Sequence, residues 1–138
     1  PNSGADPRLV EQLATKAVTL GNRDSGIAYF QACKALSEYR GGRFSQAVEW
    51  AEKARTNSEP FARAEGSAVL AMAQWRLGLR DTARASLSQG NKLAPELSTG
   101  TVDLGGGWLD WLIAWILLDE ATELVTQGST PAHNSRTQ

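Results

Sequence analysis

The chain has 138 residues, 41% hydrophobic and 21% charged, which is enough for one domain with a packed core. Its 14 Lys and Arg residues balance 15 Asp and Glu residues, so we expect no nucleic-acid binding, which needs clustered cations. The single cysteine, Cys33, excludes an internal disulfide framework and fits a reducing compartment, so we expect a cytoplasmic protein. Because the sequence opens with Pro1 rather than Met, we expect a fragment of a larger protein, whose targeting elements would lie outside it.

Apolar residues at helical spacing predict six helices along the chain. They span residues 7–20, 26–40, 44–56, 60–77, 80–93 and 108–126. Glycines follow the first, second and fourth helices, and Pro95 ends the fifth. Ser58 is expected to cap the fourth helix, with Pro60 in its first turn. Outside the helices we expect a disordered or cloning-derived start at 1–6, a loop at 94–107 with a glycine hinge, and a flexible tail at 127–138.

Part of the chain is an internal repeat: residues 31–59 recur, with drift, at 67–95, an offset of 36 residues. The two copies align Ala32 with Ala68, Arg40 with Arg76 and Gly42 with Gly78. A repeat of this size is normally one helix pair that cannot bury its apolar face alone and stacks on its neighbours. This pattern argues against an enzyme.

Within each copy, small residues recur where paired helices would cross, because only small side chains allow a close approach. They are Ala35, Ala47 and Ala54 in the first copy, and Ala71, Ala83 and Gly90, followed by Pro95, in the second. With Tyr39 and Trp75 near the ends of the first helices, this spacing resembles the tetratricopeptide repeat (TPR). The resemblance covers residues 7–126 and implies an all-α, TPR-like α-solenoid of antiparallel helix-turn-helix repeats with a long Trp-rich closing helix. That closing helix is similar to those of C-terminal TPR tails in large bacterial multidomain proteins, including some with serine/threonine kinase domains.

Such a stack has a concave face lined by the first helix of each unit, which would make the protein an interaction scaffold. In this register the partner-binding groove would present Tyr29, Leu36, Tyr39, Arg40, Met72, Trp75 and Arg76. These side chains suit a peptide or neighbouring domain docked through apolar anchors with one or two acidic contacts. The alternative is that Tyr39 and Trp75 pack between helices and leave only the two arginines exposed.

The last predicted helix is apolar on more than one face. From 108 to 118 its only charged residue is Asp110, and one stripe consists of Trp108, Trp111, Trp115 and Leu118. The run is too short to cross a membrane, which needs about 20 residues. Two interpretations stay open: the helix folds into its own concave groove with the tryptophans as core, or the stripe is an interface with an adjoining domain or a second copy, forming a homodimer.

Catalytic and metal-ligating groups are scarce. His133, the only histidine, lies in the predicted tail, so a nucleophile pair with Cys33 would require that tail to fold back. One Cys and one His cannot form a nitrogen and sulfur cage for a metal, and no cofactor motif is present. Residues 96–138 carry six acids against one Arg, which indicates either an acidic segment lying against a basic body or a solvated acidic helix face.

Overall fold

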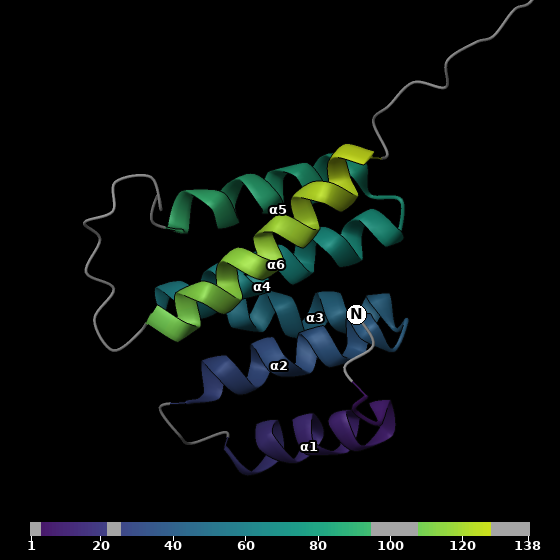
Figure 1. Ribbon diagram of the computed structural model, residues 1–138, viewed down its shortest axis with the longest axis vertical. Coiled ribbons are helices and arrows are strands. Elements are labelled where there is room, and N and C mark those ends of the chain that lie inside the picture. Colours follow the sequence, from purple (N-terminus) through teal and green to yellow (C-terminus); the bar gives the residue numbers. More distant parts are fainter. Residues whose placement is uncertain (1–3, 22–25, 95–107, 128–138) are drawn as a thin grey trace, which may run out of the picture.

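The computed structural model describes residues 4–21, 26–94 and 108–127, and within them every regular element is a helix (Figure 1). The six helices are α1 (Pro7–Leu20), α2 (Ile27–Arg40), α3 (Phe44–Arg55), α4 (Pro60–Arg76), α5 (Arg80–Leu93) and α6 (Trp108–Gln127). Each begins and ends within one or two residues of its predicted bounds, and the all-α class is confirmed. Our predictions for the 95–107 loop, its glycine hinge and the tail with His133 lie outside the described residues.

Consecutive helices from α1 to α5 pack side by side in antiparallel pairs, so that α2, α4 and α6 run in the same direction (Figure 1). The small residues of the repeat lie where these helices cross. Ala35, Ala47, Ala54, Ala71 and Ala83 have no exposed surface. A fully buried methyl group at each crossing lets the backbones approach closely.

Local signals explain where the helices begin and end. The Asp6 carboxylate accepts the Arg8 backbone N–H at 2.9 Å, which caps α1 just ahead of Pro7. The turns after α2 and α4 contain Gly42 and Gly78, with φ of 75° and 81°, a left-handed conformation that favours glycine. The predicted Ser58 cap is wrong, because Glu59 is the N-cap of α4 and makes no side-chain cap bond.

A buried polar cluster joins α1 to α2 at Lys34. The ammonium group of Lys34 binds Glu38 at 2.5 Å and the Thr15 hydroxyl at 2.8 Å. Burial alone would raise the pKa of Glu38, but hydrogen bonds from Lys34 and Arg43 outweigh it and lower that pKa. The buried ammonium group is therefore paired on two sides.

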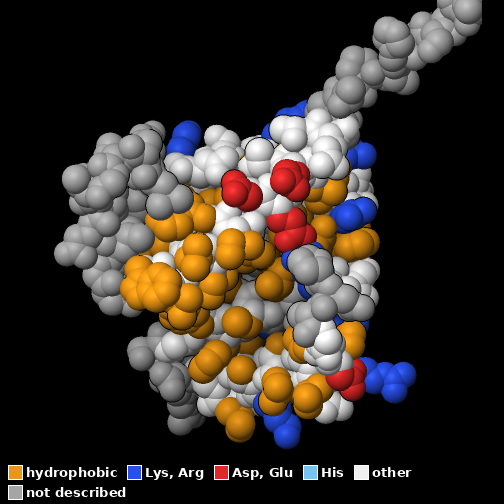
Figure 2. Space-filling model, in the orientation of Figure 1, with side chains coloured by type: hydrophobic (Ala, Val, Ile, Leu, Met, Phe, Trp, Pro, Cys, Tyr) orange, Lys and Arg blue, Asp and Glu red, His pale blue; other side chains and the backbone are white. Residues whose placement is uncertain are grey.

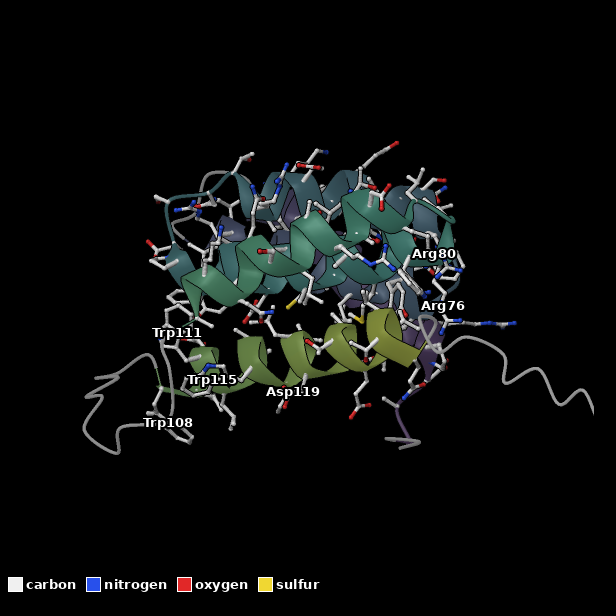
Figure 3. The ribbon with its side chains drawn as sticks, turned by 90° about the horizontal axis from the view of Figure 1, so that it is seen from above. Arg76, Arg80, Trp108, Trp111, Trp115 and Asp119 are labelled. Atoms are coloured by element: carbon white, nitrogen blue, oxygen red, sulfur yellow. The ribbon has the colours of Figure 1, made fainter. Side chains whose placement is uncertain are left out.

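The last helix departs from the regular order of the stack. Helix α4 packs more extensively against α3 than against α2, whereas α6 packs mainly against α4 and much less against α5. Seen from above, α6 forms a layer of its own along the side of the other helices (Figure 3). The closing helix therefore lies over α4, on the face where the sequence predicts the partner groove.

Candidate interaction surface

The predicted groove residues do not form one open surface, because α6 lies over α4. Met72 is fully buried, and Tyr39 and Trp75 are only 6% and 7% exposed. Tyr29 and Leu36 are half-buried, and Arg40 and Arg76 are exposed. The expectation that Met72, Tyr39 and Trp75 meet a partner is corrected here: they belong to the core, and the alternative in which only the arginines are exposed describes the geometry better.

Helix α6 of the same chain provides the acidic contact that a partner was expected to make with the predicted groove. Both terminal guanidinium nitrogens of Arg40 on α2 donate to the Glu120 carboxylate on α6, at 2.6 and 2.5 Å. Arg76 instead approaches the Tyr39 hydroxyl, with a distance of 3.5 Å from its Nε, and Arg80 lies 3.7 Å above the Trp75 ring. Helix α6 therefore occupies the groove as a docked helix with an acidic contact would.

The tryptophan stripe of α6 divides between the inside and the outside of the molecule. Trp111 packs edge to face against Phe61 of α4, with ring centroids 6.3 Å apart. The ring centroids of Trp111 and Trp115 are 6.5 Å apart. Leu118 is buried, whereas Trp108 is 56% exposed. Figure 3 shows Trp111 on the side of the body and Trp108 and Asp119 on the opposite side. Trp111 and Trp115 are half-buried and Trp108 is exposed, so these three tryptophans do not form a buried core.

The outer side of α6 carries large apolar side chains that remain substantially exposed. We call this set the α6 face; its members are Trp108, Leu109, Leu112, Ile113 and Ile116, each at least 40% exposed. Four of them follow the spacing i, i+3, i+4, i+7, which aligns side chains along one side of a helix. The predicted stripe of Trp108, Trp111, Trp115 and Leu118 left out these aliphatic residues, although their spacing is visible in the sequence.

The α6 face ends in a group of acids. Asp119, Glu120 and Glu123 follow Ile116 along the helix, and Figure 2 shows acidic side chains beside the apolar ones at this end of α6. Only Glu120 makes an ion pair, with Arg40, among the described residues. The surface is therefore apolar along the first half of α6 and negatively charged beyond it.

A second acidic group lies at the start of α6. The Asp110 carboxylate accepts a hydrogen bond from the Tyr29 hydroxyl of α2, and burial, followed by this contact, raises the pKa of Tyr29. Glu65 of α4 is 4% exposed, and its Oε1 has no hydrogen-bond partner in the described part of the chain. Burial and then repulsion from Asp110 raise the pKa of Glu65 to about 8.

Cys33 of α2 lies near Glu65 of α4. Desolvation and the nearby Glu65 raise the pKa of the Cys33 thiol, which disfavours the nucleophilic thiolate. Within residues 4–21, 26–94 and 108–127, no three His, Cys, Asp or Glu side chains lie together as metal ligands would. None of the six described helices is both long and apolar enough to cross a lipid bilayer.

Comparisons with known proteins do not assign this chain to a family. No family model matches the chain, and neither a curated protein nor a solved structure is significantly similar to it. The function is therefore argued from the site alone.

Proposed function

We propose that this protein is a noncatalytic interaction module, built from TPR-like helix pairs in an α-solenoid, that binds a partner protein through the α6 face. One observation carries the proposal: five large apolar side chains stay exposed on one side of a helix whose other side is packed. Apolar patches of this kind typically mark sites of protein contact, and Trp is frequent among the residues that dominate binding energy.

The charge on α6 narrows the chemistry of the partner. An amphipathic helix with apolar residues at heptad spacing would pack along Leu109, Leu112, Ile113 and Ile116. Lys or Arg residues at one end of that helix would then meet Asp119 and Glu123, which have no ion pair in the described structure. The face is small beside interfaces with roughly 20 to 30 residues a side, so we expect micromolar rather than nanomolar affinity.

Synthetic peptide helices test this proposal directly. Fluorescence anisotropy would compare a leucine-striped peptide ending in lysines with the same peptide ending in glutamates. We expect the lysine peptide to bind about tenfold more tightly or better, and Leu109→Ser to abolish its binding. Leu79→Ser is the matched control, because Leu79 and Leu109 are both 51% exposed but Leu79 lies outside the α6 face. The proposal is contradicted if Leu109→Ser and Leu79→Ser weaken peptide binding equally, or if the lysine and glutamate peptides bind with equal affinity.

A homodimer through the same face is the second candidate, favoured by the heptad-like spacing of its aliphatic residues. Two copies of α6 could pair side by side through this stripe. Light scattering across about a hundredfold range of concentration would show a dimer that dissociates on dilution if this candidate is correct. A constant monomer mass would exclude it and leave the heterologous partner.

A further inference from the structure

Side chains from three helices meet at the end of the molecule where α2, α4 and α6 begin. We define the acidic corner as Tyr29 from α2, Phe61 and Glu65 from α4, and Asp110 and Trp111 from α6. Two ring contacts and one hydrogen bond hold it together: Phe61 lies 4.9 Å from Tyr29 and 6.3 Å from Trp111, and Tyr29 donates to Asp110. The rings and Asp110 are half-buried, so each keeps part of its surface in solvent. Glu65 is buried and interacts electrostatically with Asp110 and Tyr29.

Negative charge in the acidic corner is not balanced within the described residues. Asp110, Glu65 and Glu59 all act on the Tyr29 hydroxyl, and every one of them raises its pKa. None of these three acids forms an ion pair with a described Lys or Arg. Acids are ordinary at the start of a helix, where they interact favourably with the positive end of the helix dipole. This accounts for Glu59 at the N-cap of α4 and for Asp110 in the first turn of α6.

Glu65 has no such explanation. It is the sixth residue of α4, it is almost completely buried, and its Oε1 lacks a hydrogen-bond partner in the described structure. A buried carboxyl group without a partner costs free energy that natural interiors normally avoid. The titratable groups that interact with it are Asp110 of α6 and Tyr29 and Cys33 of α2, none of which carries a positive charge. A cation beside Asp110 would offset this cost.

We propose that the acidic corner binds the guanidinium group of an arginine side chain presented by another molecule. A planar guanidinium group can stack on one of the rings, such as that of Trp111, and meet the edge of Phe61, since these two ring planes are 88° apart. It can at the same time donate to the Asp110 carboxylate oxygen that Tyr29 leaves free. An ammonium group is a strongly hydrated point charge and stacks less well on flat rings. The site goes beyond the proposed function, because it would bind this group even if the α6 face bound nothing.

The first test uses a small probe and a neutral analogue of the same shape. Acetyl-arginine methylamide would be titrated into the ¹⁵N-labelled protein, with the Trp111 indole N–H signal assigned through Trp111→Phe. We expect a saturable shift of this signal in the millimolar range, and none with acetyl-citrulline methylamide, whose urea group carries no charge. Equal shifts with both probes, or no saturable shift with arginine, would overturn the proposal.

Variants separate the acidic corner from the α6 face. Asp110→Asn should weaken arginine binding by about tenfold, whereas Ile116→Ser, which alters only the α6 face, should leave it unchanged. Because a bound cation favours the ionised form of Glu65, binding should release a proton near pH 7.5, and Glu65→Gln should abolish this release. A structural role for Glu65 alone predicts no proton release, and an unaffected Asp110→Asn variant would refute the site. Loss of peptide binding to the α6 face would leave all these results in place.

Discussion

Arg40 and Glu120 form a two-bond ion pair between helices that lie 80 residues apart in the sequence. The backbones of α2 and α6 do not come close together in the described structure. The Arg40–Glu120 pair and the Tyr29–Asp110 hydrogen bond therefore join the two helices through their side chains. The hydrogen bonds to Glu120 also raise the pKa of Arg40. The position of α6 over the groove thus depends on apolar packing against α4 and on side chains that reach α2 at two points.

The first prediction concerns the strength of this ion pair. The Arg40 and Glu120 side chains are 54% and 34% exposed, so solvent screens their attraction and we expect a coupling of roughly 0.5–1 kcal/mol. A double-mutant cycle of Arg40→Met and Glu120→Gln, followed by urea unfolding, measures it. Amide exchange in the second half of α6 should become faster in both variants. Zero coupling with unchanged exchange would mean that apolar contacts alone hold α6.

The second prediction compares the two sides of α6. Leu118 is 4% exposed and Ile116 is 57% exposed, although they are two residues apart. Leu118→Ala should therefore lower the free energy of unfolding by about 2–4 kcal/mol, and Ile116→Ala should change it by no more than about 0.5 kcal/mol. Urea unfolding of both variants tests this difference. Similar costs for the two would show that α6 is turned otherwise than described.

A third prediction follows from the contact of α5 with α6. A Cβ on Gly90 would lie 2.7 Å from Leu118 Cδ2 and 3.1 Å from Ser67 Cβ. Gly90→Ala adds helix propensity worth about 1 kcal/mol. In the native background the clash with Leu118 should cancel this gain in the free energy of unfolding, whereas in a Leu118→Ala background the gain should appear. Urea unfolding of the native protein, Gly90→Ala, Leu118→Ala and the double variant shows whether Gly90→Ala is stabilising only when Leu118 is shortened.

The control for that cycle is Gly66→Ala. There the new Cβ would lie 2.9 Å from the Arg55 backbone nitrogen and 3.0 Å from the Ala51 carbonyl oxygen. A backbone cannot turn aside as a leucine tip can, so this variant should be destabilised in both backgrounds. If Gly90→Ala behaves like Gly66→Ala, Leu118 is not the group that limits the space.

The fourth prediction is the pH dependence caused by Glu65. Its pKa is raised to about 8, first by burial and then by Asp110, so between about pH 5 and 8 the folded protein holds a proton that the unfolded chain has lost. Stability should therefore fall as pH rises through this window, by at most about 1.4 kcal/mol per pH unit, and then level off above pH 8.

Urea unfolding of Glu65→Gln at pH 5, 6.5 and 8 isolates this effect. The variant should resemble the native protein most closely at pH 5, where folded Glu65 is neutral like Gln and the unfolded chain has only begun to gain from ionising this group. Towards pH 8 the variant should become the more stable of the two. Glu52→Gln, which alters a surface acid paired with Arg55 at 2.6 Å, is the control for a general effect of removing a charge. Parallel curves for native protein and Glu65→Gln would contradict the buried, unpaired state of Glu65.

The helices and the small residues at their crossings could be predicted because their signals are local. Pro60, Gly42 and Gly78 limit conformation within a turn of their own position, and alanines such as Ala47 mark a crossing by spacing alone. The place of α6 could not be predicted in the same way. Which of its apolar sides faces inward depends on Phe61 and Gly90, which lie on other helices.

The acidic corner was missed for a related reason. Glu65 stands out in the sequence as an acid among small and apolar residues of the fourth helix, and it falls on the predicted concave side. Nothing local, however, indicates that Asp110 would come to lie against it, since the chain between them spans α5 and the 95–107 segment. Pairing over such separations is decided by tertiary packing rather than by local pattern.

The shift of α6 from α5 towards α4 has a consequence for how this architecture can lengthen. Arrays of this kind grow by duplication, since each new helix pair finds on the preceding pair the same seat that its predecessor used. Because α6 packs mainly against α4 and much less against α5, a helix pair added after α6 would not find the packing surface that α2 and α3 present to α4. Extension by another pair would therefore require a mode of packing different from the one that joins the earlier helices.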